Sequence, residues 1–289
     1  MKALYRITLI AALLGLSATM EAQVYNSLIR DIDPAAAGIS GASVAMETNA
    51  YSLDNNPAAM VLGSERMQAG AGYGILQPSS VKMGALSVEG FYKLGEKFAL
   101  GAGYKGFSYE TYSVTNANGT ATKDYTPKEM ALSLGAAYLI TENLSAGLKV
   151  SYASLNLGPD TKYNAFGADL GVSYTAGALT AGLDARNLGS SMTDVRAGAA
   201  YRLSSLSFYG QAEYLAKAGV MAAVGAQYSF KDMLYARCGG HYGNNEKGIP
   251  SHASLGLGVK WKGFSLDAAI LLGAEAISGT SLFSLGYSF

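Results

Sequence analysis

Apolar and polar residues alternate along most of the chain, from about residue 65 to its end. For example, Met130, Leu132 and Leu134 fall on one face of a run, whereas Ser133 and Gly135 fall on the other. Successive side chains of a β-strand point to opposite faces, so each such run predicts a strand with one apolar and one polar face. Fourteen runs are found, with approximate ranges 65–75, 82–93, 97–111, 128–141, 143–157, 161–176, 178–188, 193–204, 205–216, 219–230, 233–243, 251–262, 263–273 and 279–289.

The connections between these predicted strands differ in length at the two ends of the sheet. Those after the even-numbered strands are very short, whereas those after strands 1, 3, 5, 11 and 13 are mostly longer, the longest being 112–127. The connection after strand 9 is short and departs from this trend. Short turns at one end and longer loops at the other are typical of outer-membrane β-barrels.

A closed barrel explains both patterns. In hydrocarbon every backbone N–H and C=O group must be paired, and a closed sheet does this without leaving an edge. Strands of about 10–12 residues are long enough to cross a bilayer at a tilt. The sequence therefore predicts an all-β fold: a transmembrane antiparallel β-barrel of about 14 strands, integral in the outer membrane of a Gram-negative bacterium and surrounded by its lipid.

The N-terminus has the features of a signal peptide over residues 1–22. Lys2 and Arg6 precede an apolar stretch at 7–16, and the small residue Ala22 ends the segment. The remainder contains no other apolar run of 18 residues, so the sequence predicts no transmembrane helix.

Composition agrees with a wall that faces lipid. Charged residues make up 15% of the chain, against roughly 25% in an average soluble domain. The net charge is zero, which argues against a nucleic-acid partner, and the single cysteine excludes a disulfide-stapled scaffold. Many of the 20 tyrosines fall on the apolar face near strand ends, where we expect an interfacial aromatic girdle.

Charged residues of the predicted strands fall mostly on the polar, lumen-facing side. One interpretation is structural: cross-strand pairs that fill the lumen and tie it to an inner segment. The other is a channel lining that sets selectivity. The lumen-facing candidates are Lys149, Asp169, Asp184, Arg186, Arg196, Arg202, Glu213, Arg237, Lys260 and Asp267.

Catalytic and metal-binding motifs are not found in the sequence. His241 and His252 lie on adjacent predicted strands, with His241 expected to face inward and His252 outward, and no clear third ligand accompanies them. No Ser-His-Asp arrangement or phosphate-binding loop stands out. We therefore expect no enzyme activity, no cofactor and no metal.

A segment without alternation, residues 24–62, precedes the predicted barrel. It contains the run G-x-x-G-A-x-V-A at 38–45 and the tripeptide Asn56-Pro57-Ala58. This opening resembles that of the FadL-related barrels, and more closely their PorV/PorQ branch, which is associated with type IX secretion in Bacteroidetes-type bacteria. Runs further along the chain that also resemble this family are LDARNLG (183–189), VRAGAAY (195–201), YARCGGHYG (235–243) and the final SLGYSF.

The resemblance implies how the chain is organised. In FadL relatives the N-terminal segment folds inside the barrel as a hatch, and a kinked strand lets hydrophobic molecules leave sideways. The implied division is a signal peptide at 1–22, a hatch at 23–63 and a barrel at 64–289. The hatch residues that match the family are Gly38, Gly41, Asn56, Pro57 and Ala58.

The last predicted strand ends in alternating aromatic and apolar residues. This ending resembles the signal that is read by the outer-membrane barrel assembly machinery, which is therefore an expected partner. The residues concerned are Phe283, Leu285, Tyr287 and Phe289.

Three functions are open at this point. The PorV/PorQ resemblance implies a component of type IX-like protein secretion or surface attachment that binds secreted or surface proteins. The alternative is a FadL-like passive channel for small hydrophobic molecules. The second alternative is a closed structural barrel.

Overall fold

The computed structural model describes residue 28 and residues 31–76, 83–115, 121–158, 161–190, 192–247, 249–273 and 277–289. The expected signal peptide and the first residues of the expected hatch lie outside the described residues.

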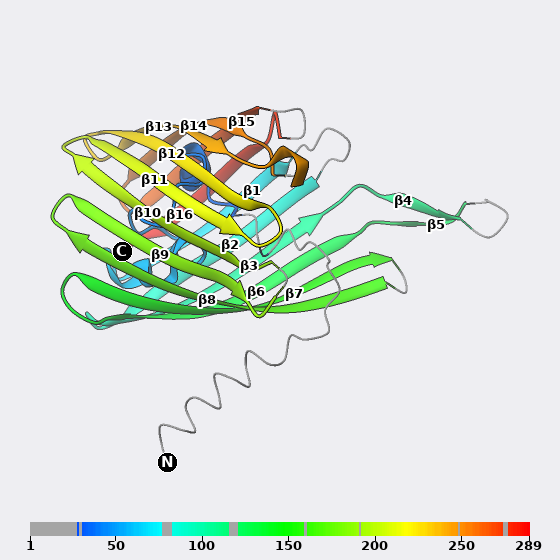
Figure 1. The fold of residues 1–289 in the computed structure, drawn as a ribbon, viewed down its shortest axis with the longest axis horizontal. Coiled ribbons are helices and arrows are strands. Elements are labelled where there is room, and N and C mark those ends of the chain that lie inside the picture. Colours follow the sequence, from blue (N-terminus) through cyan, green and yellow to red (C-terminus); the bar gives the residue numbers. More distant parts are fainter. Residues whose placement is uncertain are drawn as a thin grey trace, which may run out of the picture.

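Fourteen antiparallel strands close into a barrel within the described residues (Figure 1). Consecutive strands are neighbours around the wall, and the first strand pairs with the last. The all-β barrel predicted from the alternation is therefore confirmed. Its strands are β1 (Met67–Leu76), β2 (Met83–Leu94), β3 (Phe98–Ser108), β6 (Lys128–Leu139), β7 (Leu144–Gly158), β8 (Thr161–Ala176), β9 (Leu179–Leu188), β10 (Asp194–Leu203), β11 (Leu206–Leu215), β12 (Gly219–Phe230), β13 (Leu234–Tyr242), β14 (His252–Trp261), β15 (Phe264–Gly273) and β16 (Ser281–Ser288).

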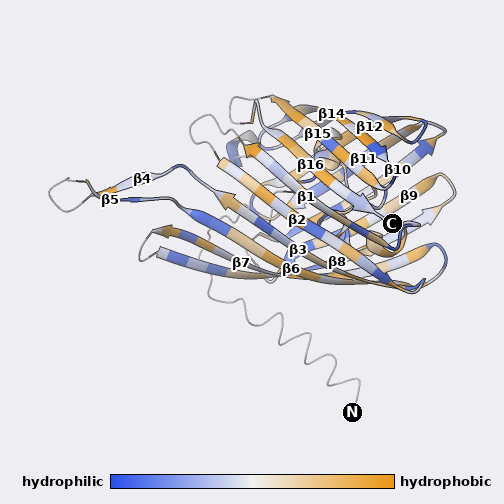
Figure 2. Cartoon of the chain, turned by 180° about the vertical axis from the view of Figure 1, so that it is seen from behind, coloured by the Kyte–Doolittle hydropathy of each residue, from blue (hydrophilic) through white to orange (hydrophobic). Residues whose placement is uncertain are grey.

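The outer face of the barrel is apolar. Large hydrophobic side chains project from the wall, among them Phe166, which is 69% exposed, and Leu257, which is 68% exposed. Figure 2 shows hydrophobic residues recurring along the strands. A contiguous apolar surface of this kind suits hydrocarbon and not water. The predicted location, integral in the outer membrane, is confirmed by the closed barrel and its apolar exterior.

No helix among the described residues is long and apolar enough to cross a membrane.

The two ends of the barrel differ, as the loop lengths predict. At one end, here called the turn end, tight turns use left-handed residues such as Gly95 and Gly177. At the other end, the loop end, strands β4 (Tyr112–Thr115) and β5 (Ala121–Tyr125) form a hairpin that projects beyond the rim (Figure 1). In barrels of this type the longer loops face the cell exterior.

Residues 31–62, here called the hatch, lie inside the barrel (Figure 1). They include the short helices α3 (Pro34–Gly38) and α4 (Ser52–Asn55) and the 3-10 helix η1 (Pro57–Val61). A second 3-10 helix, η2 (Asn245–Lys247), lies in the connection between β13 and β14. Helix α3 packs against β13 to β16, and η1 packs against β6, β7 and β8, so the hatch contacts opposite parts of the wall.

Candidate functional site

The hatch begins with a capped helix whose cap is itself held in place. One carboxylate oxygen of Asp33 accepts a hydrogen bond from the backbone N–H of Ala35 at 2.9 Å, which caps α3. The other oxygen accepts from Asn49 at 2.7 Å and from Asn55 at 2.8 Å. Burial raises the pKa of Asp33, and the two amides oppose this. Asp33 therefore ties together three parts of the hatch.

The Asn56-Pro57-Ala58 tripeptide joins the hatch to the wall. Asn56 caps η1 by accepting from the N–H of Ala58 at 3.1 Å, and its amide donates to the carbonyls of Val44 and Val172. Pro57 occupies the first turn of η1, where a missing N–H costs nothing. The hydroxyl of Ser145 on β7 donates to the carbonyl of Ala58 at 2.8 Å. This tripeptide is thus a docking point.

Two hatch glycines have different structural roles. A Cβ on Gly38 would lie 3.1 Å from Arg237 Cβ and from Gly256 Cα, so glycine permits close approach to β13 and β14. Gly41 has a φ of +82°, a left-handed conformation that glycine adopts without strain.

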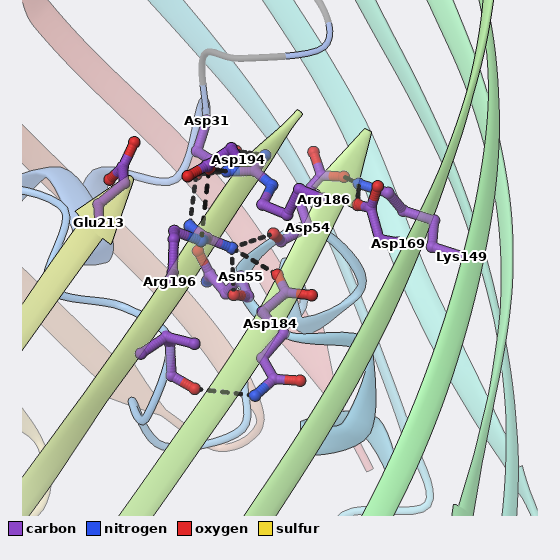
Figure 3. A network of polar contacts seen from close by, with 12 residues as sticks. Asp31, Asp54, Asn55, Lys149, Asp169, Asp184, Arg186, Asp194, Arg196 and Glu213 are labelled. Atoms are coloured by element: carbon purple, nitrogen blue, oxygen red, sulfur yellow. Dashed lines mark hydrogen bonds and ion pairs between the residues drawn. The ribbon is translucent and has the colours of Figure 1, made fainter. Parts of the chain in front are cut away.

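A buried ion-pair network joins the hatch to the wall, and Asp54 is its first centre (Figure 3). Its two carboxylate oxygens lie 2.7 Å from the ammonium groups of Lys105 on β3 and Lys149 on β7. All three side chains are 4% exposed. Burial opposes the charge on Asp54, but the two lysines outweigh it and hold the pKa of Asp54 well below its usual range. Lys149 also pairs with Asp169 at 2.6 Å.

Two arginines form the second centre of this network (Figure 3). Arg186 on β9 contacts Asp31 of the hatch at 2.9 Å. Arg196 on β10 donates to Asp184 at 2.9 Å and to the backbone carbonyl of Asn55 at 2.6 Å. Strands β9 and β10 therefore contact the hatch at its start and at helix α4.

The remaining lumen-facing candidates lie closer to the turn end, apart from Glu213. Arg202 pairs with Glu47 of the hatch at 2.8 Å, and Lys260 lies 3.6 Å from Glu65. Arg237 on β13 pairs with Asp267 on β15 at 2.6 Å. Nine of the ten candidates thus take part in ion pairs, and the contacts favour the pairing interpretation over a selective channel lining.

Several members of this network, Asp31 among them, were not predicted from the sequence. Lys105 occupies an inward position of β3, so the alternation could have identified it. Asp54 lies in the hatch, where no periodic signal exists. Asn187 sits in a β-bulge of β9 with a φ of +53°, and its N–H donates to Asp169 at 2.8 Å. The bulge turns Arg186 and Asn187 inward together, which strict alternation does not predict.

The hatch separates two cavities. The one at the loop end, here called the outer cavity, has a volume of about 680 Å³, and Leu76, Ile277 and Leu282 are among its lining residues. The one at the turn end, here called the inner cavity, has a volume of about 560 Å³ and is lined by many serines. Asp33 lines both cavities, so the start of α3 forms the wall between them.

His241 and His252 form a pair on the wall of the outer cavity. They are directly opposite in the β13–β14 register, and their rings stack with centroids 4.9 Å apart. The outward orientation expected for His252 is wrong, because residues directly opposite on antiparallel strands share a face. Within the described ranges, no group of three or more His, Cys, Asp or Glu side chains is arranged to hold a metal ion.

The four C-terminal residues that resemble an assembly signal lie on the outer face. They belong to β16 or follow it directly, and each is about half exposed. Their recognition by the assembly machinery stays a prediction. The residues are Phe283, Leu285, Tyr287 and Phe289.

Comparison with known proteins relates the fold to hydrocarbon transporters. No protein-family model matches the chain, and no curated protein matches it in sequence. The structure is similar to the toluene transporter TbuX of Ralstonia pickettii, with a TM-score of 0.67 and 14% identity over 89% of this chain and 98% of the other. It is also similar to the toluene transporter TodX of P. putida, with a TM-score of 0.65 and 13% identity over 93% and 99%.

A Pseudomonas aeruginosa FadL homologue is similar as well, with a TM-score of 0.60 and 12% identity over 91% of this chain and 99% of the other. At these identities the likeness concerns the fold. The resemblance to FadL-related barrels is confirmed at that level, and the named neighbours are transporters or their homologues and not enzymes. They give no support to the PorV/PorQ branch.

Proposed function

We propose that the protein is a passive channel through which small hydrophobic molecules cross the outer membrane. The observation that carries this proposal is the outer cavity, which opens toward the loop end above the hatch and has a volume of about 680 Å³. Much of its lining is apolar, as expected for a ligand site. Apolar residues that line it are Ile32, Ala36, Ala37, Leu76, Met192, Leu215, Ala218, Ile249, Leu271, Ile277 and Leu282.

The cavity would act as a transient binding site between the cell exterior and the hatch. A hydrophobic molecule gains free energy there by leaving water, at about 25 cal/mol per Å² of apolar surface buried. The ion pair of Asp54 with Lys149 and the contacts of Arg196 with Asp31 and with the carbonyl of Asn55 hold the hatch below it. Onward movement would therefore require the hatch, or the wall beside it, to shift. The fold similarity to TbuX and TodX supports the same proposal.

Filling the outer cavity should slow transport severalfold without unfolding the barrel. Ala37 lies on α3, is half-buried and lines this cavity. We expect Ala37→Trp to lower the uptake of labelled toluene severalfold in intact Gram-negative cells that express the barrel, whereas Ala37→Ser should leave it unchanged. Cells are needed because toluene crosses a simple phospholipid bilayer without help. Equal uptake by Ala37→Trp cells and wild-type cells would rule out this route.

A protein-binding role, as in the PorV/PorQ branch, is the second candidate, and the β4–β5 hairpin favours it. The hairpin extends beyond the rim, and its base is braced by a hydrogen bond from the Tyr112 hydroxyl to the carbonyl of Leu157 at 2.5 Å. A projection of this kind is suited to contact a partner outside the cell.

Removal of the hairpin distinguishes the two functions. If a secreted or surface protein is the partner, replacing residues 112–125 with a short turn should abolish its co-purification from native membranes. Toluene uptake should then be unaffected. A closed structural barrel, the remaining alternative, would show neither uptake nor a partner, and steady conductance in planar bilayers would exclude it.

A further inference from the structure

The outer cavity has a polar side and an apolar side. Strands β10 and β11 supply Asp194 and Glu213, and the hatch adds Asp31. Across the cavity, β1, β15 and β16 supply Leu76, Leu271 and Leu282, with Ile277 beside them. A pure hydrocarbon would match only one of these sides.

Acceptor oxygens on the polar side have unused hydrogen-bonding capacity. Asp194 is 4% exposed, and its Oδ1 has no hydrogen-bond partner among the described residues. Its Oδ2 lies 3.8 Å from Arg186 and 4.0 Å from Arg196, longer than a good ion pair. Glu213 receives one weak contact, from Gln211 at 3.4 Å. A buried carboxylate oxygen that accepts no hydrogen bond raises the free energy of the folded protein. A ligand that donates a hydrogen bond to it removes that penalty.

The two arginines at the floor of the cavity are less available to a ligand than the carboxylates beside them. The terminal nitrogens of Arg186 face Asp31, and those of Arg196 contact Asp31, Asp184 and backbone carbonyls. Both side chains are almost completely buried, and only their Nε atoms lack a hydrogen-bond partner within the described part of the chain. Two lysines, at 217 and 247, line the cavity from the loop connections. A carboxylate ligand at the floor would have to compete with Asp31 for both arginines.

We infer that the outer cavity selects small apolar molecules that carry an amine or a hydroxyl group. The inference rests on the proposed passage of hydrophobic molecules and specifies their class. The donor would face Asp194 and Glu213, and the apolar body would lie against Leu271 and Leu282. A site with an unpaired buried acceptor rejects a ligand that lacks the donor, because the acceptor is then dehydrated without compensation. Selection therefore arises from the polar side of the cavity.

Four ligands of similar shape test this inference: benzylamine, benzyl alcohol, toluene and benzoate. Their binding to the full mature barrel in lipid nanodiscs is measured by equilibrium dialysis, with protein-free nanodiscs as the blank. We expect benzylamine and benzyl alcohol to bind about tenfold more tightly than toluene, and benzoate to bind most weakly. Toluene or benzoate binding as tightly as benzylamine would overturn the inference.

Substitution of Asp194 and Glu213 tests whether these carboxylates cause the preference for ligands with a donor. Asp194→Asn should weaken benzylamine binding about tenfold or more, because the ammonium group loses a charged acceptor, and should leave toluene unchanged. Glu213→Gln should act in the same direction, and it provides the test if Asp194→Asn does not fold. The control is Glu65→Gln, the same change at the inner cavity, which should have no effect.

The outcomes separate this inference from the proposed function. If all four compounds bind equally, or if neither variant weakens benzylamine, the selection for a donor is wrong while passage of hydrophobic molecules stands. If none of the four binds to the barrel and none is taken up by cells that express it, the proposed function fails and the inference with it.

Discussion

Replacing Asp54 with alanine is expected to lower the free energy of unfolding by about 3–5 kcal/mol. Asp54 lies between Lys105 and Lys149, at 2.7 Å from each, and both ammonium groups are buried. Without the carboxylate, Lys105 and Lys149 each lose an ion pair at 2.7 Å, and Lys149 retains Asp169 at 2.6 Å. The measurement is reversible urea unfolding of the barrel in lipid bilayers. The folded fraction at each urea concentration is read from heat-modifiable gel migration.

Two comparisons show whether loss of the balancing carboxylate charge is the cause. Glu65→Ala removes an acid whose partner, Lys260, is 41% exposed, so it should change stability by less than about 1 kcal/mol. Adding Lys105→Met to Asp54→Ala removes one of the two ammonium groups that Asp54 balances and should recover part of the loss. If the double variant is instead less stable than Asp54→Ala, lost packing and not the lost charge balance explains the effect.

The wall of the barrel could be predicted from sequence because lipid and lumen impose opposite demands on successive residues. Strand β12 was expected at 219–230 and occupies Gly219–Phe230, and β8 likewise matches its predicted range. The ends are less accurate where a strand runs into a loop. The third strand, expected at 97–111, ends at Ser108, where the chain leaves the barrel for the hairpin.

The hatch contacts could not be predicted, because they depend on surfaces that meet only after folding. Asp54 lies in a segment with no period, and its two lysines come from strands that are far apart in the sequence. Asn187 is a second case, since its bulge shifts the register by one residue between β8 and β9. His252 is different: its neighbours Ser254 and Gly256 face inward, so the alternation itself places it on the lumenal side.

Replacing Gly147 with alanine should loosen the hatch and raise ion conductance. A Cβ on Gly147 would lie 2.4 Å from the backbone nitrogen of Ala58 and from the carbonyl carbon of Pro57. Real Cβ atoms essentially never come this close, and the obstructing atoms are backbone, so η1 must move away from β7. Overpacking of this kind typically costs about 1–3 kcal/mol. Planar-bilayer recordings and hydrogen exchange of residues 52–61 measure the two effects.

Gly210→Ala is the matched control, because a Cβ at that position on β11 meets no atom within 4 Å. It should leave both conductance and hatch protection unchanged. Gly171→Ala, opposite Gly147 on β8, should reproduce the Gly147 effect, since its Cβ would lie 2.2 Å from Asn56 Oδ1. If both wall variants keep wild-type conductance and exchange, the hatch is not held by contact with this glycine pair. The hatch would then be held by its other contacts with the wall, such as the ion pairs of Asp54.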